Sequence, residues 1–353
     1  MKNILVVDDS ALMRRVICDI INSDELFQAE DVCKDGLEAY EKIKSVGYDA
    51  VILDVNMPKM DGLELLERLQ AEKIKATVIM VSTLTTKDAQ TTLLAMERGA
   101  VDFVPKPGNI IEAKGNAFRD QLLGVLRAVL DPKQSMEHSP AAEKASALRR
   151  AQPALKKSTG GKKLVALACS TGGPKALQSV IPFLPKDMKA PMVLVQHMPV
   201  GFTKTMAQRL NEISKVRVKE AEEGDLLQDG TVYVAPGGKH MLVKRAPGGG
   251  HKIALSDAPA IGGLKPCANL TYQSLADCGY DEVICVVLTG MGADGTQGIL
   301  ELGKKKPVHT IVQNAETCVV YGMPKAVVTA KAADEIVPLN EVAQEIIKNV
   351  GVK

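Results

Sequence analysis

The chain is built around short aliphatic runs that end abruptly in an acid, a hydroxyl or a glycine. Segments with helical spacing follow several of these runs, as in Ala11–Ile21, where Ser10 is placed to cap the helix, and in Gly62–Gln70. The runs of the first half are Ile4–Val7, Val51–Leu53, Thr77–Val81 and Gly99–Val104. Repeated strand–helix units predict a doubly wound parallel sheet, in which ligands bind beyond the carboxyl ends of the strands.

The second half shows the same pattern. Its aliphatic runs are Leu164–Cys169, Met192–Val195 and Val283–Leu288, and each is followed by polar residues or glycines. Three shorter segments resemble hairpin strands separated by glycine-rich turns: Thr231–Val234, His240–Val243 and Lys252–Leu255. We therefore predict a second parallel α/β domain with a small β-hairpin region.

The length of 353 residues fits two domains. Between the two halves, residues 131–160 contain no aromatic residue and few large aliphatic ones. Such a stretch buries too little apolar area to offset its ordering entropy. We predict a domain over residues 1–125, a linker over 126–162 that is helical in part, and a second domain over 163–350. An ordinary helix of one of the domains is the alternative interpretation of the middle stretch.

Charge and cysteine usage exclude several classes of protein. A net charge of +2 provides no electrostatic footprint for nucleic acid. No apolar run is long enough to span a membrane, and Asp8 and Asp9 follow the first aliphatic run too closely for a signal peptide. The seven cysteines are odd in number and form no C-x-x-C pair. We expect a cytoplasmic protein with reduced thiols and no direct membrane insertion.

Carboxylates gather at the predicted strand ends of the first half. Asp8 and Asp9 end one strand and Asp54 ends another. Three converging carboxylates repel one another, and a divalent cation such as Mg²⁺ relieves that repulsion. The cation neutralises an incoming phosphoryl group and leaves one Asp oxygen free to attack phosphorus. Ser82 and Lys106 follow two further strands and can hold the phosphoryl oxygens.

Residues 1–125 resemble the receiver domain of two-component response regulators, on Asp8-Asp9, Asp54 with Asn56-Met57-Pro58, Asp61-Gly62, Ser82-Thr83 and Lys106-Pro107. The resemblance implies a flavodoxin-like fold with Asp54 as phosphoacceptor. It implies that Asp9 and Asp54 bind Mg²⁺ directly, Asp8 through water, and Asn56 through its backbone carbonyl. It also implies that Ser82 is the switch hydroxyl and Lys106 the phosphate-sensing lysine. Phe103 matches the family's aromatic switch position, although a core residue fits equally well.

A nucleophile of the second half is indicated at Ser170, where a strand turns into a glycine-rich helix start. A serine hydroxyl needs a base within hydrogen-bond reach, and His197 ends another strand. Asp294, after a third strand, can hold the imidazole in the required tautomer. The order Ser, His, Asp along the chain excludes the α/β-hydrolase fold, which runs Ser, acid, His.

Other interpretations of these residues stay open at this point. A serine in a glycine-rich turn is more often a cap or a phosphate cradle than a nucleophile. Cys169 is a rival nucleophile beside Ser170, but its side chain should point to the opposite face and be buried. A receiver joined to a dinucleotide-binding domain is a weak alternative, because no G-x-G-x-x-G opens a helix in the second half.

The second half resembles the catalytic domain of the chemotaxis protein-glutamate methylesterase family. The matching motifs are Ala168-Cys169-Ser170-Thr171-Gly172-Gly173-Pro174, Gln196-His197-Met198-Pro199, Val234-Ala235-Pro236-Gly237, Thr289-Gly290-Met291-Gly292-Ala293-Asp294-Gly295, Gln313 and Tyr321-Gly322-Met323-Pro324. With the receiver and the linker, the resemblance covers nearly the whole chain. It implies a Rossmann-like three-layer α/β domain in which Ser170, His197 and Asp294 form a triad. The N–H of Met291, with Thr171 nearby, would stabilise the oxyanion. Ala168 departs from the glycine that is common in the family.

The resemblance implies a phosphorylation-activated hydrolase that removes methyl groups from glutamate γ-methyl esters of chemotaxis receptors and deamidates receptor glutamines. Methyl-accepting receptors would be its substrates and a sensor histidine kinase its phosphodonor. Mg²⁺ would serve the receiver, and the esterase reaction would need no cofactor. The unphosphorylated receiver is expected to inhibit the enzyme. The alternative from another class is a phosphorylation-controlled binding module without catalysis.

Overall fold

The computed structural model describes residues 1–83, 85–109, 112, 115–130 and 161–351. The chain divides into two compact units, Met1–Gln134 and Ser135–Lys353. Most of the predicted linker, residues 131–160 with its expected helical part, lies outside the described residues. The first residues of that predicted linker belong to a helix that ends at Leu130, because Leu126 packs in the core of the first unit and Ala128 is buried.

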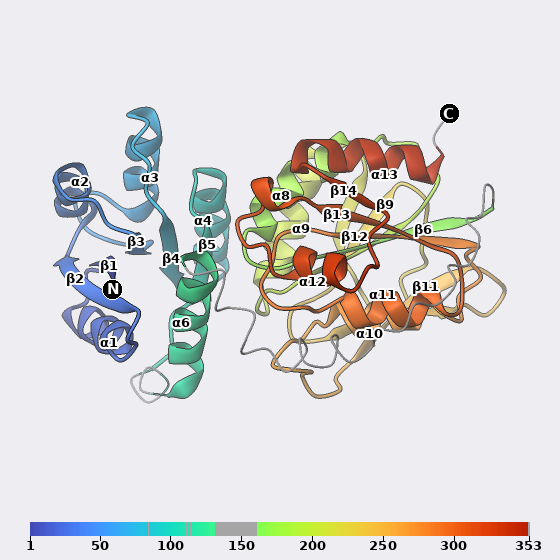
Figure 1. The fold of residues 1–353 in the computed structure, drawn as a ribbon, viewed down its shortest axis with the longest axis horizontal. Helices are drawn as coiled ribbons and strands as arrows, with labels where there is room; N and C mark the ends of the chain where they lie inside the picture. The colour runs from blue at the N-terminus through green and yellow to red at the C-terminus, as the bar shows by residue number, and fades with distance from the viewer. Residues whose placement is uncertain (84, 110–111, 113–114, 131–160, 352–353) are drawn as a thin grey trace. The chain divides into compact units, whose positions relative to one another are not determined.

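The first unit contains a parallel sheet in the order β2-β1-β3-β4-β5 (Figure 1). Its strands are β1 (Lys2–Val7), β2 (Phe27–Cys33), β3 (Ala50–Asp54), β4 (Val78–Ser82) and β5 (Asp102–Pro105). Its helices are α1 (Ala11–Asn22), α2 (Gly36–Ser45), α3 (Gly62–Ala71), α4 (Thr86–Glu97) and α6 (Asn116–Leu130). Every residue of β3 and β4 is buried, as expected for parallel strands covered on both faces. The strand order reverses between β1 and β3, which places the expected ligand site beyond their carboxyl ends.

Two details of the first unit differ from the sequence predictions. The strand predicted from Gly99 begins only at Asp102, because the N–H groups of Gly99 and Ala100 still bond to carbonyls at the end of α4. The prediction did not include β2 and α2. Strand β2 alternates between buried and exposed residues at the sheet edge, so it lacks the continuous aliphatic run that marked the central strands. The predicted cap of α1 is confirmed, since the N–H of Met13 donates to Ser10 Oγ at 3.4 Å.

The second unit contains a larger parallel sheet in the order β14-β13-β12-β6-β7-β9-β8. Its strands are β6 (Lys163–Cys169), β7 (Met192–Gln196), β8 (Arg217–Glu220), β9 (Thr231–Val234), β12 (Glu282–Val287), β13 (Val308–Gln313) and β14 (Glu335–Val337). Its helices are α8 (Gly173–Gln178), α9 (Phe202–Ile213), α10 (Ala268–Ser274), α11 (Thr296–Gly303), α12 (Met323–Thr329) and α13 (Val342–Val350), with 3₁₀ turns at Ile181–Phe183, Ala315–Thr317 and Leu339–Glu341. Here the strand order reverses between β6 and β12.

The predicted hairpin region is confirmed for two of its three strands. Strands β10 (His240–Arg245) and β11 (His251–Ser256) pair antiparallel. The third, β9, was wrongly assigned to the hairpin: it pairs in parallel with β7 and β8 inside the main sheet. All four of its residues are buried, and so short a run does not reveal its partners in the sequence. The predicted class of two parallel-sheet α/β domains is confirmed.

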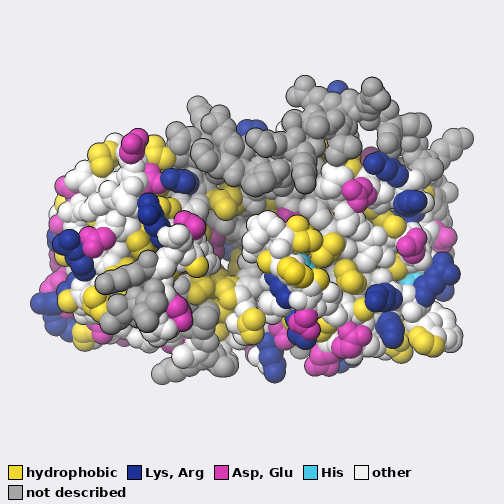
Figure 2. Space-filling view, turned by 90° about the horizontal axis from the view of Figure 1, so that it is seen from below, with side chains coloured by type: hydrophobic (Ala, Val, Ile, Leu, Met, Phe, Trp, Pro, Cys, Tyr) yellow, Lys and Arg dark blue, Asp and Glu magenta, His cyan; other side chains and the backbone are white. Residues whose placement is uncertain are grey.

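The surface agrees with the nearly neutral composition. Positive and negative side chains alternate with apolar ones over the face shown in Figure 2. Among the helices that the structure describes, none is both long and apolar enough to cross a membrane.

Candidate functional site

The acidic pocket lies at the reversal point of the first sheet. Asp8 directly follows β1, and Asp54 is the last residue of β3. Carboxylate oxygens of Asp8, Asp9 and Asp54 all lie within 4.8 Å of one another. Lys106, which follows β5, places its Nζ 2.8 Å from Asp8 Oδ2 and 2.7 Å from Asp54 Oδ2. The structure thus brings together these four of the predicted residues.

Charge in this pocket is incompletely balanced. Burial, with a smaller contribution from the Asp8 carboxylate, raises the pKa of Asp54 to about 6 even though the ammonium of Lys106 acts to lower it. Burial disfavours the charged form of Lys106, yet its pKa is raised overall because Asp54 and Asp8 hold the ammonium. A cluster of hard oxygen donors that keeps an excess of negative charge suits a small divalent cation such as Mg²⁺.

Two other predicted residues of the pocket form hydrogen bonds with side chains of α4. The side-chain amide of Asn56 donates to Asp88 Oδ1 at 2.9 Å. Ser82 is fully buried, and its Oγ accepts a hydrogen bond from Thr92 Oγ1 at 2.8 Å. Asp88 and Thr92 were not among the residues predicted from the sequence. The Thr85-x-x-Asp88 pattern is a helix-start signal, but nothing in it points to Asn56.

The second site lies at the reversal point of the second sheet. Strands β6 and β7 are in register at Cys169 and Gln196, so Ser170 and His197 are the next residues on adjacent strands. The backbone N–H of His197 donates to Cys169 O at 3.2 Å, which continues the ladder to this point. Neighbouring strands are roughly 4.8 Å apart, so the serine and the histidine emerge side by side.

The loop after β12 passes directly over Ser170. The N–H of Ser170 donates to Thr289 O at 3.0 Å. A Cβ at Gly290 would lie 2.8 Å from Ser170 Cβ and 2.5 Å from Met323 Sδ, so only glycine allows this approach. Gly172, with φ of +76°, starts α8 on the other side of Ser170. The glycines of the two motifs therefore let the chain pack closely around Ser170.

His197 and Asp294 form a buried pair. His197 Nε2 lies 2.8 Å from Asp294 Oδ2, and Asp294 is 4% exposed. Burial alone would raise the pKa of Asp294. The hydrogen bond from His197 and the backbone N–H groups of Asn269 and Ala268 outweigh it, so the pKa is lowered. Asp294 is therefore an anion at neutral pH.

Gln196 joins the two strand ends that carry Ser170 and His197. Its Nε2 donates to Ser170 O at 3.0 Å and lies 3.2 Å from His197 O. Its Oε1 accepts from the thiol of Cys169 at 3.0 Å. Cys169 is fully buried, and burial raises the pKa of its thiol well above the usual range, which supports its interpretation as an inert residue.

The predicted oxyanion donors flank Ser170. Thr171 is the next residue and is buried, while Met291 is 40% exposed. Within the part of the chain that the structure describes, no hydrogen bond is recorded from the backbone N–H of either residue. The expected oxyanion role of these two N–H groups therefore stays a prediction.

The Asp294 carboxylate accepts hydrogen bonds from residues that were not predicted from the sequence. Its carboxylate accepts from the N–H of Ala268 at 2.6 Å and of Asn269 at 3.0 Å, both in the first turn of α10. Cys267 Sγ lies 3.2 Å from Asp294 Oδ1. The sequence does not reveal which side chain caps the start of this helix.

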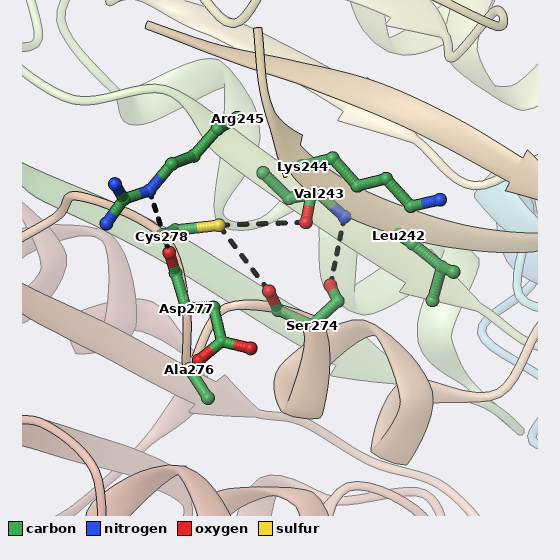
Figure 3. Close-up of a pocket in the computed structure, with 8 residues that line it drawn as sticks. All are labelled: Leu242, Val243, Lys244, Arg245, Ser274, Ala276, Asp277 and Cys278. Carbon is green, nitrogen blue, oxygen red and sulfur yellow. Dashed lines mark hydrogen bonds between the residues drawn. The ribbon is translucent and has the colours of Figure 1, made fainter.

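A pocket away from these residues lies between β10 and the end of α10 (Figure 3). Two hydrogen bonds link its walls: Val243 N donates to Ser274 Oγ at 2.9 Å, and Arg245 Nε donates to Asp277 O at 3.1 Å. None of the predicted site residues lines it.

The fold and the two sites define the class of protein. One unit is a parallel α/β domain with an acidic pocket, and the other is an α/β domain with Ser, His and Asp at one sheet edge. Residues 4–114 match the family model of the response regulator receiver domain, and residues 165–346 match that of CheB methylesterase. The chain belongs to the CheB methylesterase family.

Similar proteins span both units. A protein-glutamate methylesterase/protein-glutamine glutaminase of Pyrococcus horikoshii is 41% identical over 99% of this chain and 94% of its own. One of Geobacillus kaustophilus is 40% identical over 99% of this chain and 98% of its own. The crystal structure of the Thermotoga maritima CheB methylesterase catalytic domain is 40% identical, with a TM-score of 0.51, and covers 54% of this chain and 99% of that one.

Proposed function

We propose that this protein hydrolyses glutamate γ-methyl esters of methyl-accepting chemotaxis receptors and deamidates receptor glutamines. The observation that carries the proposal is the buried His197–Asp294 hydrogen bond one strand away from Ser170. The names of the full-length relatives agree with it.

The imidazole of His197 would act through its Nδ1. Because Nε2 faces the Asp294 carboxylate at 2.8 Å, the neutral ring carries its proton there and leaves Nδ1 as the base. Nδ1 takes the proton of Ser170 as Oγ attacks the side-chain carbonyl carbon of the substrate. Asp294 stabilises the imidazolium that forms, and its lowered pKa keeps it charged throughout.

The tetrahedral oxyanion would be bound by the N–H groups of Met291 and Thr171. The intermediate collapses when His197 returns its proton to the leaving group, which is methanol from an ester or ammonia from an amide. Water, deprotonated by His197, then releases the free glutamate carboxylate and restores Ser170. No metal is needed for these steps.

Asp54 would be the phosphoacceptor that controls this activity. Asp9 and Asp54 would hold Mg²⁺ directly, Asp8 through water and Asn56 through its carbonyl. Bound Mg²⁺ would neutralise charge on the incoming phosphoryl group. Lys106 already contacts Asp54 and would bind a phosphoryl oxygen, whereas Ser82 would have to exchange its bond with Thr92 to do so. A sensor histidine kinase would supply the phosphoryl group, and the unphosphorylated receiver would hold activity low.

Methanol release from a methyl-esterified receptor tests the proposal, measured with and without a small phosphodonor plus Mg²⁺. We expect release that the phosphodonor stimulates in the wild type but not in Asp54→Asn. A serine-directed fluorophosphonate should label the wild type and not Ser170→Ala. If Ser170→Ala retains full release, the assigned nucleophile is wrong, and a protein that neither releases methanol nor takes the label is the non-catalytic binding module.

A further inference from the structure

Two helices of the second unit exchange caps at the candidate site. The side chain of Asp294 accepts the first N–H groups of α10, those of Ala268 and Asn269. In return, the side-chain oxygen of Asn269 accepts the N–H of Gly295 at 3.1 Å and of Gly298 at 2.7 Å, at the start of α11. Gly295 directly follows Asp294. Each of the two side chains therefore accepts N–H groups from the helix start that lies next to the other residue.

We propose that Asn269 is a positioning residue for the Asp294–His197 pair, an inference that rests on the function proposed above. Asn269 holds Asp294 from two directions: its backbone N–H binds the carboxylate, and its side chain binds the N–H of the residue that follows. The backbone and the carboxylate of Asp294 are thus fixed to the same residue of α10, and the carboxylate keeps one oxygen on His197 Nε2.

Helix α10 is a firm support for this arrangement. The hydroxyl of Tyr272, a fully buried residue of α10, lies 3.3 Å from both Ala166 O in β6 and Val286 O in β12. These two strands lead to Ser170 and to the loop that carries Asp294. The position of α10 is therefore set by the same strands that carry the reacting groups.

Loss of the Asn269 side chain would change the position of the Asp294 carboxylate. A Cβ at Gly298 would lie 2.8 Å from Asn269 O, so α10 and α11 are in close contact, and the glycines at 295 and 298 are both buried. Without Asn269 Oδ1, the N–H of Gly295 retains only Asp294 Oδ1, at 3.0 Å. The carboxylate is then drawn toward its own helix start and away from the imidazole.

The test compares three variants of the full-length protein by methanol release. Asn269→Ala removes the cap, and Asn269→Asp keeps an acceptor of the same shape. The matched control is Gln273→Ala, which removes another α10–α11 link, from Gln273 Nε2 to Glu301 Oε2 at 2.7 Å, further along both helices. We expect kcat to fall about 10–100-fold in Asn269→Ala with KM little changed. Gln273→Ala should stay within about threefold of the wild type, and Asn269→Asp, which restores the acceptor but adds a charge beside Asp294, should give a kcat between those of Asn269→Ala and the wild type.

The pH profile separates positioning from a general loss of structure. A carboxylate held less firmly stabilises the imidazolium less, so the acid limb of kcat/KM should move to lower pH in Asn269→Ala and stay in place in Gln273→Ala. Equal kcat and equal profiles for these two variants would overturn the proposal.

Two further variants complete the design. If Asn269→Ala does not fold, Asn269→Ser replaces it: the shorter side chain places its oxygen farther from the two N–H groups, so kcat should be reduced, and a wild-type kcat and profile would overturn the proposal. Ser170→Ala measured in parallel keeps the two hypotheses apart. If it retains activity, the proposed triad fails; if it is inactive while Asn269→Ala is normal, only the positioning role fails.

Discussion

Replacing Asp54 by Asn should make the first unit more stable at neutral pH, although it removes a salt bridge. The Asp54 carboxylate is 4% exposed, and it lies within 4.8 Å of the other acidic oxygens of the pocket. The ammonium of Lys106 offsets the cost of burial and of repulsion at Asp54 only in part, because it is shared with Asp8 at 2.8 Å. In Asp54→Asn, Lys106 keeps Asp8, and one buried negative charge disappears.

The magnitude follows from the raised pKa of Asp54. A carboxyl that titrates near 6 in the folded protein and at 3.8 when unfolded makes the ionised folded state less stable by about 3 kcal/mol at pH 7. Because the amide also loses the Lys106 contact, we expect a gain of about 1–3 kcal/mol in Asp54→Asn. Below pH 3.8 the carboxyl is protonated in both states and the gain vanishes. Between pH 3.8 and about 6 the folded state holds a proton that the unfolded state has lost, so the gain grows with pH; above about 6 it is constant.

Urea unfolding without Mg²⁺, followed by a probe in the first unit, measures this difference at several pH values. Subtracting the wild-type free energy of unfolding from that of Asp54→Asn at each pH cancels the contributions of all other titrating groups. Asp9→Asn is the control, because Asp9 belongs to the same pocket but is exposed, and it should give a smaller gain. A difference that is zero or negative at pH 7, or that shrinks as pH rises from 4 to 7, would refute the reasoning.

The remaining predictions concern the metal and the second site. Mg²⁺ should raise the unfolding midpoint of the first unit more in the wild type than in Asp54→Asn, and equal shifts in a thermal melt would argue against a site at Asp54. His197→Ala should lower the rate of methanol release by at least about 10³-fold, and a smaller loss would mean that another group takes the serine proton. Gln196→Leu, which removes the amide at nearly constant volume, should reduce kcat about 10-fold while circular dichroism shows a folded protein; wild-type kcat would contradict its role in holding the two strand ends. Cys169→Ala should keep most of the activity, and loss of activity on mild thiol alkylation of the wild type but not of this variant would show that the thiol is reactive after all.

The sequence predicted the places of these residues because strand ends are visible in it. Each parallel strand is a buried aliphatic run, and the polar residue after it lies at the carboxyl edge of the sheet. The cluster at Asp8, Asp54 and Lys106 and the pairing of His197 with Asp294 follow that rule. The rule does not say which strands are neighbours, which is why β9 was assigned to the hairpin and not to a place beside β7.

Contacts between polar groups of different helices and strands could not be predicted in this way. Asn269 of α10 accepts hydrogen bonds from Gly295 and Gly298 at the start of α11. Thr92 of α4 donates a hydrogen bond to Ser82 at the end of β4. Each of these bonds depends on how two helices, or a helix and a strand, are rotated against each other. That rotation is set by packing of buried side chains, such as Tyr272 under β6 and β12, and not by any pattern local to the polar residues.

Two aspartates with the same exposure have pKa values that are shifted in opposite directions by their surroundings. Asp54 and Asp294 are each 4% exposed, yet the pKa of Asp54 is raised to about 6 and that of Asp294 is lowered. Asp294 accepts from the imidazole and from backbone N–H groups at two helix starts, whereas Asp54 has one backbone N–H, from Val55 at 2.7 Å, and a lysine that it shares with another carboxylate. A charge that is already satisfied gains little from a new partner and is suited to orient a histidine through every turnover. A charge that is left under-compensated gains strongly from a cation or from covalent modification, so under the proposed function the energetic drive for a switch would lie at Asp54 and not at Asp294.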